Sequence, residues 1–254
     1  MTLLAVVCPS SARAATITLN SDFQGTSVVF ALNGQNYGST LGSILASGGA
    51  GLGGALDAPN SFETYCVDFF TGVFFPDDHL PHPPATFDVA APGSLMSGWT
   101  ATNGLNSAAA GQRAAWLYNT YATTFAGLDT GVGLAERAAL QIAIWNVLYD
   151  GDFSVAATGG GSTYVRDNAS DPTSQVRTFA QSYLDALAIS PTVASSDAAW
   201  LRLSYVNPTT GLVTDAQDFI GPLASATQVP EPAAGLLLGV GVACLAGFRR
   251  LRRV

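Results

Sequence analysis

Lysine is missing from this sequence altogether, and charged residues of any kind are scarce. They make up 11% of the 254 residues, all ten basic residues are arginine, and the net charge at pH 7 is −8. Between residues 15 and 230, 17 acidic residues stand against 5 arginines, a net charge of −12. A body with this charge does not attract phosphate backbones or anionic membrane surfaces. We therefore expect an acidic, soluble domain without a nucleic-acid partner.

Nucleotide and metal motifs are also missing. The chain has no glycine-rich phosphate loop and no dinucleotide fingerprint, so we predict no cofactor. His79 and His82 lie in a proline-rich segment without further clustered ligands, which indicates a solvated loop. Asp150-Gly151-Asp152 and Asp167-Asn168 lack the full spacing of a calcium loop and indicate turns. Calcium binding at these residues stays open, and no metal site is predicted.

The first fourteen residues have the features of an export signal. Leu3 to Val7 is an apolar core, and Ala12-Arg13-Ala14 is a small-residue cleavage pattern before Ala15. We predict a signal peptide over residues 1–14, truncated at its start because it lacks a basic n-region. A short N-terminal strand is the alternative, but it would not explain the small-residue pattern.

The C-terminal end has three parts in order. Pro230-Glu231-Pro232 is followed by an uncharged run from Ala233 to Phe248 and then by an arginine cluster made of Arg249, Arg250, Arg252 and Arg253. The run is near the shortest length that spans a bilayer. Basic residues after it favour a cytoplasmic end, which places the body outside the inner membrane.

These three parts together resemble the PEP-CTERM sorting signal, a tail also known as the ice-binding protein C-terminal domain, although that label implies nothing about ice here. The resemblance covers residues 230–254. It implies a Gram-negative producer of exopolysaccharide or biofilm, and an exosortase that cleaves near Pro230-Glu231-Pro232. The membrane helix would then be transient, and the protein would end at the cell surface or outside the cell. An ordinary membrane anchor is the alternative.

The cysteines become informative once both ends are assigned. Cys8 lies in the predicted signal peptide and Cys244 in the predicted membrane segment, so one cysteine, Cys66, remains in the exported body. Disulfides are the usual fate of cysteines outside the cytoplasm. A lone thiol there is buried, joined to another chain or chemically used.

The sequence pattern of the body, residues 15–222, predicts an α+β domain with strands at both ends around three helices. β-branched and aromatic residues favour strands, and glycine and serine favour a long loop over Gly38–Gly54. The strands are expected at Thr16–Leu19, Ser27–Leu32, Ser61–Phe70, Thr86–Ala90, Phe153–Val155, Trp200–Val206 and Leu212–Ile220; the short one at Phe153–Val155 precedes a flexible glycine loop. Helices are expected from Ser107 to about Phe125, over Leu134–Tyr149, and from Pro172 through Leu187. A linker, residues 223–229, leads to the single transmembrane sorting helix.

The middle helix carries a polar residue on a buried face. Leu140, Ile144 and Leu148 repeat every four residues, and Gln141 and Trp145 form a second stripe beside them. A helix that is apolar on nearly all sides is buried on nearly all sides. Gln141 then needs a partner, which is either a backbone carbonyl or hydroxyl or, through a covalent bond, a cysteine thiol.

Two motifs resemble the signatures of bacterial surface thioester domains. Tyr65-Cys66-Val67 fits the aromatic–Cys–hydrophobic motif of that family, and residues 140–145, Leu-Gln-Ile-Ala-Ile-Trp, fit its hydrophobic–Gln–x–Ala–hydrophobic–Trp motif. The resemblance covers Ser61 to Asp152. The best-known members are adhesins of Gram-positive bacteria, so the Gram-negative tail is a departure that leaves a role in host adhesion open.

The resemblance implies an internal thioester between Cys66 and Gln141, with Tyr65 and Trp145 as pocket walls. The Cys66 sulfur attacks the Gln141 carbonyl and ammonia leaves. An amine on a partner then attacks the thioester and becomes amide-linked to Gln141. Because this happens once, we expect a covalent anchor and not an enzyme. The absence of lysine fits this idea because it avoids self-crosslinking, although a GC-rich genome that encodes arginine in place of lysine is the larger cause.

Two alternatives remain from the sequence. The first is a buried thiol and a hydrogen-bonded glutamine in a non-covalent structural or carbohydrate-associated protein of the exopolysaccharide matrix. The second is a cysteine hydrolase, which requires a histidine beside Cys66 in space.

Overall fold

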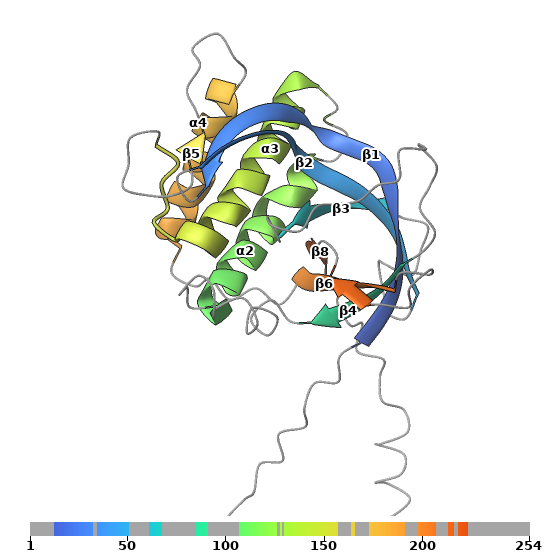
Figure 1. Ribbon diagram of the computed structural model, residues 1–254. Coiled ribbons are helices and arrows are strands. Elements are labelled where there is room, and N and C mark those ends of the chain that lie inside the picture. Colours follow the sequence, from blue (N-terminus) through green and yellow to red (C-terminus); the bar gives the residue numbers. More distant parts are fainter. Residues whose placement is uncertain are drawn as a thin grey trace, which may run out of the picture.

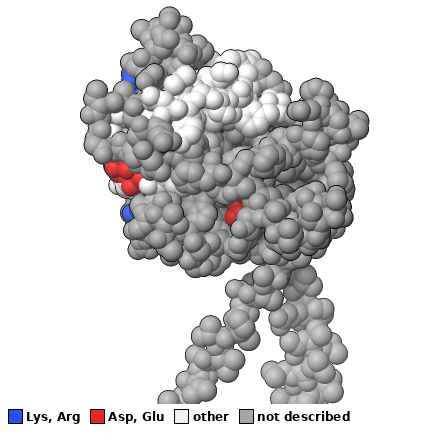
Figure 2. Space-filling view, viewed as in Figure 1, with Lys and Arg blue, Asp and Glu red and all other residues white. Residues whose placement is uncertain are grey.

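A computed structural model of the chain describes residues 13–32, 35–50, 61–67, 85–90, 107–125, 128, 130–156, 164–165, 173–190, 198–206, 213–215 and 218–222. The helices lie together on one side of the molecule, where two long curved strands arch over them (Figure 1). Strand β5 lies beside α4 on the same side, and β3, β4, β6 and β8 lie on the other side (Figure 1). Most of the described surface in Figure 2 is uncharged, in line with the composition.

The described strands pair in antiparallel order β2-β3-β8-β6-β4-β1-β5, with β7 on β6. Strand β1 also pairs with β2, so β1, β2, β3, β8, β6 and β4 close into a ring. Closure gives each of these six strands a partner on both sides, which leaves few open edges to template aggregation. The bounds are β1 Arg13–Leu32, β2 Gln35–Ala50, β3 Ser61–Cys66, β4 Ala85–Ala90, β5 Tyr164–Val165, β6 Ala198–Val206, β7 Val213–Asp215 and β8 Phe219–Pro222.

The described part of the chain has three α-helices, which pack against the strands around the main hydrophobic core. They are α2 Ser107–Tyr121, α3 Gly131–Trp145 and α4 Thr173–Ala188. A 3₁₀ turn, Ala122–Phe125, extends α2, and a π-helical turn, Asn146–Asp150, extends α3. Leu140, Ile144 and Leu148 are buried, as their spacing predicted. The α+β prediction, with strands at both ends around three helices, is confirmed.

The expected loop over Gly38–Gly54 is wrong, because strand β2 occupies most of it. Strand β2 pairs with β1 on one side and β3 on the other. Hydrogen bonding on both edges overrides the low strand propensity of glycine and serine, which is a context-dependent preference. The two strands expected at Thr16–Leu19 and Ser27–Leu32 are likewise one strand, β1, with a register shift between Leu19 and Phe23.

The β1–β2 pair requires glycine where the two strands approach most closely. Gly25 and Gly42 face each other in the register, and the φ of Gly42 is 157°. A Cβ atom at Gly42 would overlap the carbonyl oxygen of Gln24, and one at Gly25 would overlap that of Leu41. Glycine permits this close backbone approach because it has no side chain.

We predict that Gly42→Ala destabilises the protein by about 2 kcal/mol or more, because the new methyl group forces the two strands apart. Urea unfolding followed by circular dichroism measures the change. Gly38→Ala is the matched control in the same strand, since a Cβ there meets no atom within 4 Å. Equal stabilities of the two variants would contradict the close-approach explanation.

Candidate functional site

Strand β3 changes partners just before Cys66. Ser61 to Thr64 pair with β2, whereas Tyr65 and Cys66 pair with β8 on the other side. The Val67 N–H continues towards β8 by donating to the Asp218 carbonyl at 3.0 Å. The edge of β3 that faces away from β8 therefore loses its strand partner at Cys66. Its buried backbone groups need other partners.

Helix α3 supplies those partners. Thr130 precedes the helix in an extended conformation, and alanines at several inward positions let the helix axis approach the sheet. Arg137, Gln141 and Trp145 follow one another at intervals of four residues and are all buried. Residues at this spacing lie on one face of a helix.

Gln141 binds the main chain of Cys66 with both ends of its carboxamide. The Cys66 N–H donates to Gln141 Oε1 at 3.0 Å, and Gln141 Nε2 donates to the Cys66 carbonyl at 2.6 Å. This is the exchange that two residues of an antiparallel ladder make, with a side chain in place of the missing strand. The polar end of Gln141, 1% exposed, is thereby satisfied.

A buried ion pair lies next to this contact. Arg137 Nε and Nη2 donate to Glu63 Oε1 at 2.9 and 2.8 Å, and the two side chains are 2% and 9% exposed. Arg137 also donates to the carbonyls of Phe125 and Leu128, at 2.7 and 2.8 Å. Arg137 therefore joins the end of the α2 segment, the start of α3 and strand β3.

Two tyrosine hydroxyls donate hydrogen bonds to main-chain carbonyls of β3 and of the residue that follows it. The Tyr118 hydroxyl donates to the Glu63 carbonyl at 2.7 Å, and the Tyr149 hydroxyl donates to the Val67 carbonyl at 3.1 Å. Burial, reinforced by the negative charge of Glu63, raises the pKa of Tyr118. Burial and the same carboxylate also hold the pKa of Tyr65 well above its usual value.

The two predicted pocket walls are chain neighbours of the Cys–Gln pair, since Tyr65 directly precedes Cys66 and Trp145 follows Gln141 by four residues. Tyr65 is fully buried, donates to Glu63 Oε2 at 3.0 Å and packs edge-on against Tyr118. Trp145 is 6% exposed and packs against Phe30 with ring centroids 5.5 Å apart. Neighbouring strand residues point to opposite faces, so Tyr65 and Cys66 diverge at their side chains. The wall role of both aromatic residues stays a prediction.

Sequence reasoning missed Glu63, Arg137, Tyr118 and Tyr149. A signal was present for one of them, because Arg137 interrupts an otherwise apolar helix face and a buried guanidinium requires a carboxylate. Nothing local pointed to Glu63, which looked like a surface position of a strand. The two tyrosine contacts depend on tertiary packing alone.

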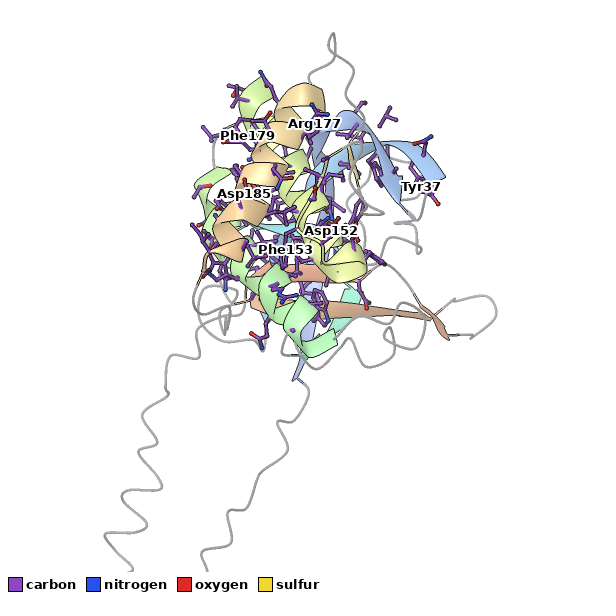
Figure 3. The ribbon with its side chains drawn as sticks, turned by 90° about the vertical axis from the view of Figure 1, so that its left-hand side faces the viewer. Tyr37, Asp152, Phe153, Arg177, Phe179 and Asp185 are labelled. Atoms are coloured by element: carbon purple, nitrogen blue, oxygen red, sulfur yellow. The ribbon has the colours of Figure 1, made fainter. Side chains whose placement is uncertain are left out.

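The predicted turn at Asp150-Gly151-Asp152 is a hydrogen-bonded corner. Asp152 Oδ1 accepts from Asn146 Nδ2 at 3.1 Å and from the Ser154 N–H at 2.9 Å. Asp152 and Phe153 lie beside helix α4 (Figure 3). Among the residues that the structure describes, no three His, Cys, Asp or Glu side chains gather as metal ligands. His79, His82 and Asp167-Asn168 lie outside the described residues, so the hydrolase alternative stays untested.

The sorting residues Pro230, Glu231, Pro232, Arg249, Arg250, Arg252 and Arg253 also lie outside the described residues, as does the predicted membrane segment. No helix within the described ranges is long and apolar enough to cross a membrane. Residues 1–12 of the predicted signal peptide are outside them too, while Arg13 and Ala14 belong to β1.

Residues 228–253 match the PEP-CTERM protein-sorting motif, which confirms the predicted tail. The motif implies export, anchoring in the membrane and processing by an exosortase. No curated protein matches the sequence.

Among solved structures, the chain is similar to the N-terminal thioester domain of a surface protein from Clostridium perfringens. The identity is 13%, the TM-score is 0.38, and the match covers 77% of this chain and 98% of that chain.

We predict that Glu63→Leu destabilises the protein by about 3–5 kcal/mol, because it leaves the Arg137 guanidinium buried without its carboxylate. The double variant Glu63→Leu/Arg137→Met should regain most of that loss, since no unpaired charge remains. Urea unfolding of the two variants and the parent gives the comparison. A loss below about 1 kcal/mol in the single variant would show that the pair does not hold α3 on β3.

We also predict that stability falls as the pH rises above about 10, the ordinary pKa of tyrosine. Tyr65 and Tyr118 keep their protons in the folded protein while the unfolded chain loses them, so each contributes stability below pH 10 that is lost above it. The expected loss is about 1.4 kcal/mol per pH unit for each tyrosine. Urea midpoints in a Cys66→Ala background measure it, and Tyr118→Phe should make the pH dependence shallower. If stability depends on pH as steeply in Tyr118→Phe as in the parent, Tyr118 does not cause the loss of stability.

Proposed function

We propose that this exosortase-sorted surface protein attaches covalently to an amine-bearing partner through a thioester between Cys66 and Gln141. The observation that carries the proposal is the two-point contact of the Gln141 carboxamide with the main chain of Cys66. It holds the electrophilic carbon beside the residue that bears the thiol. An amide is an unreactive electrophile, so its reaction with a thiol depends strongly on close contact and on the relative orientation of the two groups.

The contact also supplies electrostatic help. Attack by the Cys66 sulfur on the Gln141 carbonyl carbon pushes negative charge onto Oε1. That oxygen already accepts the Cys66 N–H at 3.0 Å, and a fixed backbone donor aimed at a developing oxyanion stabilises it. The C–N bond then breaks, the amide nitrogen takes the thiol proton, and ammonia leaves.

Burial protects the product of this step. Gln141 is 1% exposed, and Cys66 is partly buried. Exclusion of water slows hydrolysis of a reactive acyl group. The bond then waits for an amine, which displaces the Cys66 thiol and leaves an amide on Gln141.

The partner is a different molecule. The chain has no lysine, so a second copy offers no side-chain amine. Candidates are amine-bearing molecules of the cell surface or of an exopolysaccharide matrix, consistent with a role in biofilm or adhesion. The bond forms once per molecule, which makes the protein an anchor and not a turnover enzyme.

A second function, a non-covalent matrix protein, is favoured by one specific observation. The Gln141 carboxamide makes hydrogen bonds at both its oxygen and its nitrogen, as a purely structural core glutamine does. The two functions differ in one property that can be measured, the covalent state of Gln141.

The intact mass of the purified protein distinguishes them. We expect a mass lower by one ammonia than the sequence requires, and the full mass in Cys66→Ala, which keeps every backbone contact of Gln141. Methylamine should convert the lighter species into an adduct on Gln141. A full mass together with a freely alkylated Cys66 would leave only the non-covalent function.

A further inference from the structure

The contact between Gln141 and Cys66 has a chemical requirement that only a primary amide meets. Its oxygen and its nitrogen both face the same backbone residue. A primary amide is planar and carries one N–H on the same side as its oxygen, so both can point at Cys66 together. This is the geometry of the unreacted glutamine side chain.

The thioester, and the amide formed with a larger amine, each lose one of the two hydrogen bonds to Cys66. A thioester has no N–H, so the Cys66 carbonyl loses its donor. In the amide of a larger amine, the favoured trans form places the substituent, and not the N–H, beside the oxygen. Keeping both hydrogen bonds would require the cis form, which is disfavoured by a factor of roughly ten to a hundred in simple amides. Only ammonia rebuilds the two-point contact.

We propose that ammonia reverses thioester formation at this site, so that the ammonia concentration regulates the fraction of protein able to react with a partner. The proposal rests on the function proposed above. In the reverse step ammonia attacks the Gln141 acyl carbon, the carbon–sulfur bond breaks, and the sulfur leaves as the thiol with one proton from ammonia. The products are Gln141 and the Cys66 thiol, and no oxidant or reductant is needed.

The site favours ammonia over other nucleophiles for two physical reasons. Gln141 is 1% exposed, so a side chain on a folded partner reaches it less readily than ammonia does, and ammonia is a stronger nucleophile than the water that burial largely excludes. The Cys66 carbonyl holds the departing nitrogen at 2.6 Å, and the same acceptor receives ammonia on its return, because forward and reverse steps share one path. Attachment to a larger amine then requires the Gln141 side chain to turn away from Cys66.

Isotope exchange tests this regulation directly. The full-length exported protein is incubated in ammonium chloride labelled with heavy nitrogen, digested, and analysed by mass spectrometry. We expect the heavy nitrogen to appear in the Gln141 side chain. The fraction of the light species, which is the thioester form with a mass lower by one ammonia, should fall as the ammonium concentration rises. At equal free-base concentrations, methylamine should react roughly seventyfold less than ammonia, relative to a small-molecule thioester treated in parallel.

The chain offers two matched controls. Gln181 also hydrogen-bonds through both ends of its carboxamide, to the Val155 N–H and the Phe153 carbonyl, each at 3.0 Å. Since Cys66 is the one cysteine in the described part of the chain, Gln181 should take up no label. Cys66→Ala should take up none at Gln141.

Each outcome decides between specific alternatives. Label at Gln141 that depends on Cys66 supports the proposal, even where the thioester never accumulates. A stable light species without label overturns the regulation and leaves the covalent function standing. Neither a light species nor label overturns both. Label in Cys66→Ala or at Gln181 shows an exchange that does not pass through the thioester, and also overturns the proposal.

Discussion

The edge of β3 that loses its strand partner at Cys66 is the constraint on which the rest of the site depends. Backbone groups buried there must be paired, and no strand of the described part of the chain pairs with Cys66 on that edge. Helix α3 supplies a side chain instead, since Gln141 bonds both the N–H and the carbonyl of Cys66, while Tyr118 and Tyr149 donate to the neighbouring carbonyls of Glu63 and Val67. The helical layer is therefore joined to the sheet by directional bonds as well as by apolar packing.

The register between α3 and β3 follows from a charge pair. Arg137 and Glu63 are both buried, and separating them in a medium of low polarity is expensive, so their contact tolerates little sliding of the helix. Gln141 lies one turn after Arg137 on the same face, which brings it to the level of Cys66. A pair with no chemical role thus determines where the candidate reactive residues meet.

The same hydrogen bonds serve a structural glutamine and prepare a reactive one. A donor on Oε1 and an acceptor at Nε2 satisfy a buried carboxamide, and they also stabilise the oxyanion and hold the leaving nitrogen when a thiol attacks. Contacts alone do not distinguish these roles. What distinguishes them is the covalent state of Gln141, since the thiol of Cys66 is present in both.

The sequence by itself determined the sorting tail, the fold class, the buried helix and the candidate pair, because each depends on local pattern. Pro230-Glu231-Pro232 is read in order along the chain, and the apolar spacing of α3 reports burial without knowledge of the neighbours. Only the tertiary structure decided that glycine-rich residues form β2 and that Glu63 is buried against Arg137. Strand pairing and ion pairing join residues far apart in sequence, so neither leaves a periodic signal in the segments that take part.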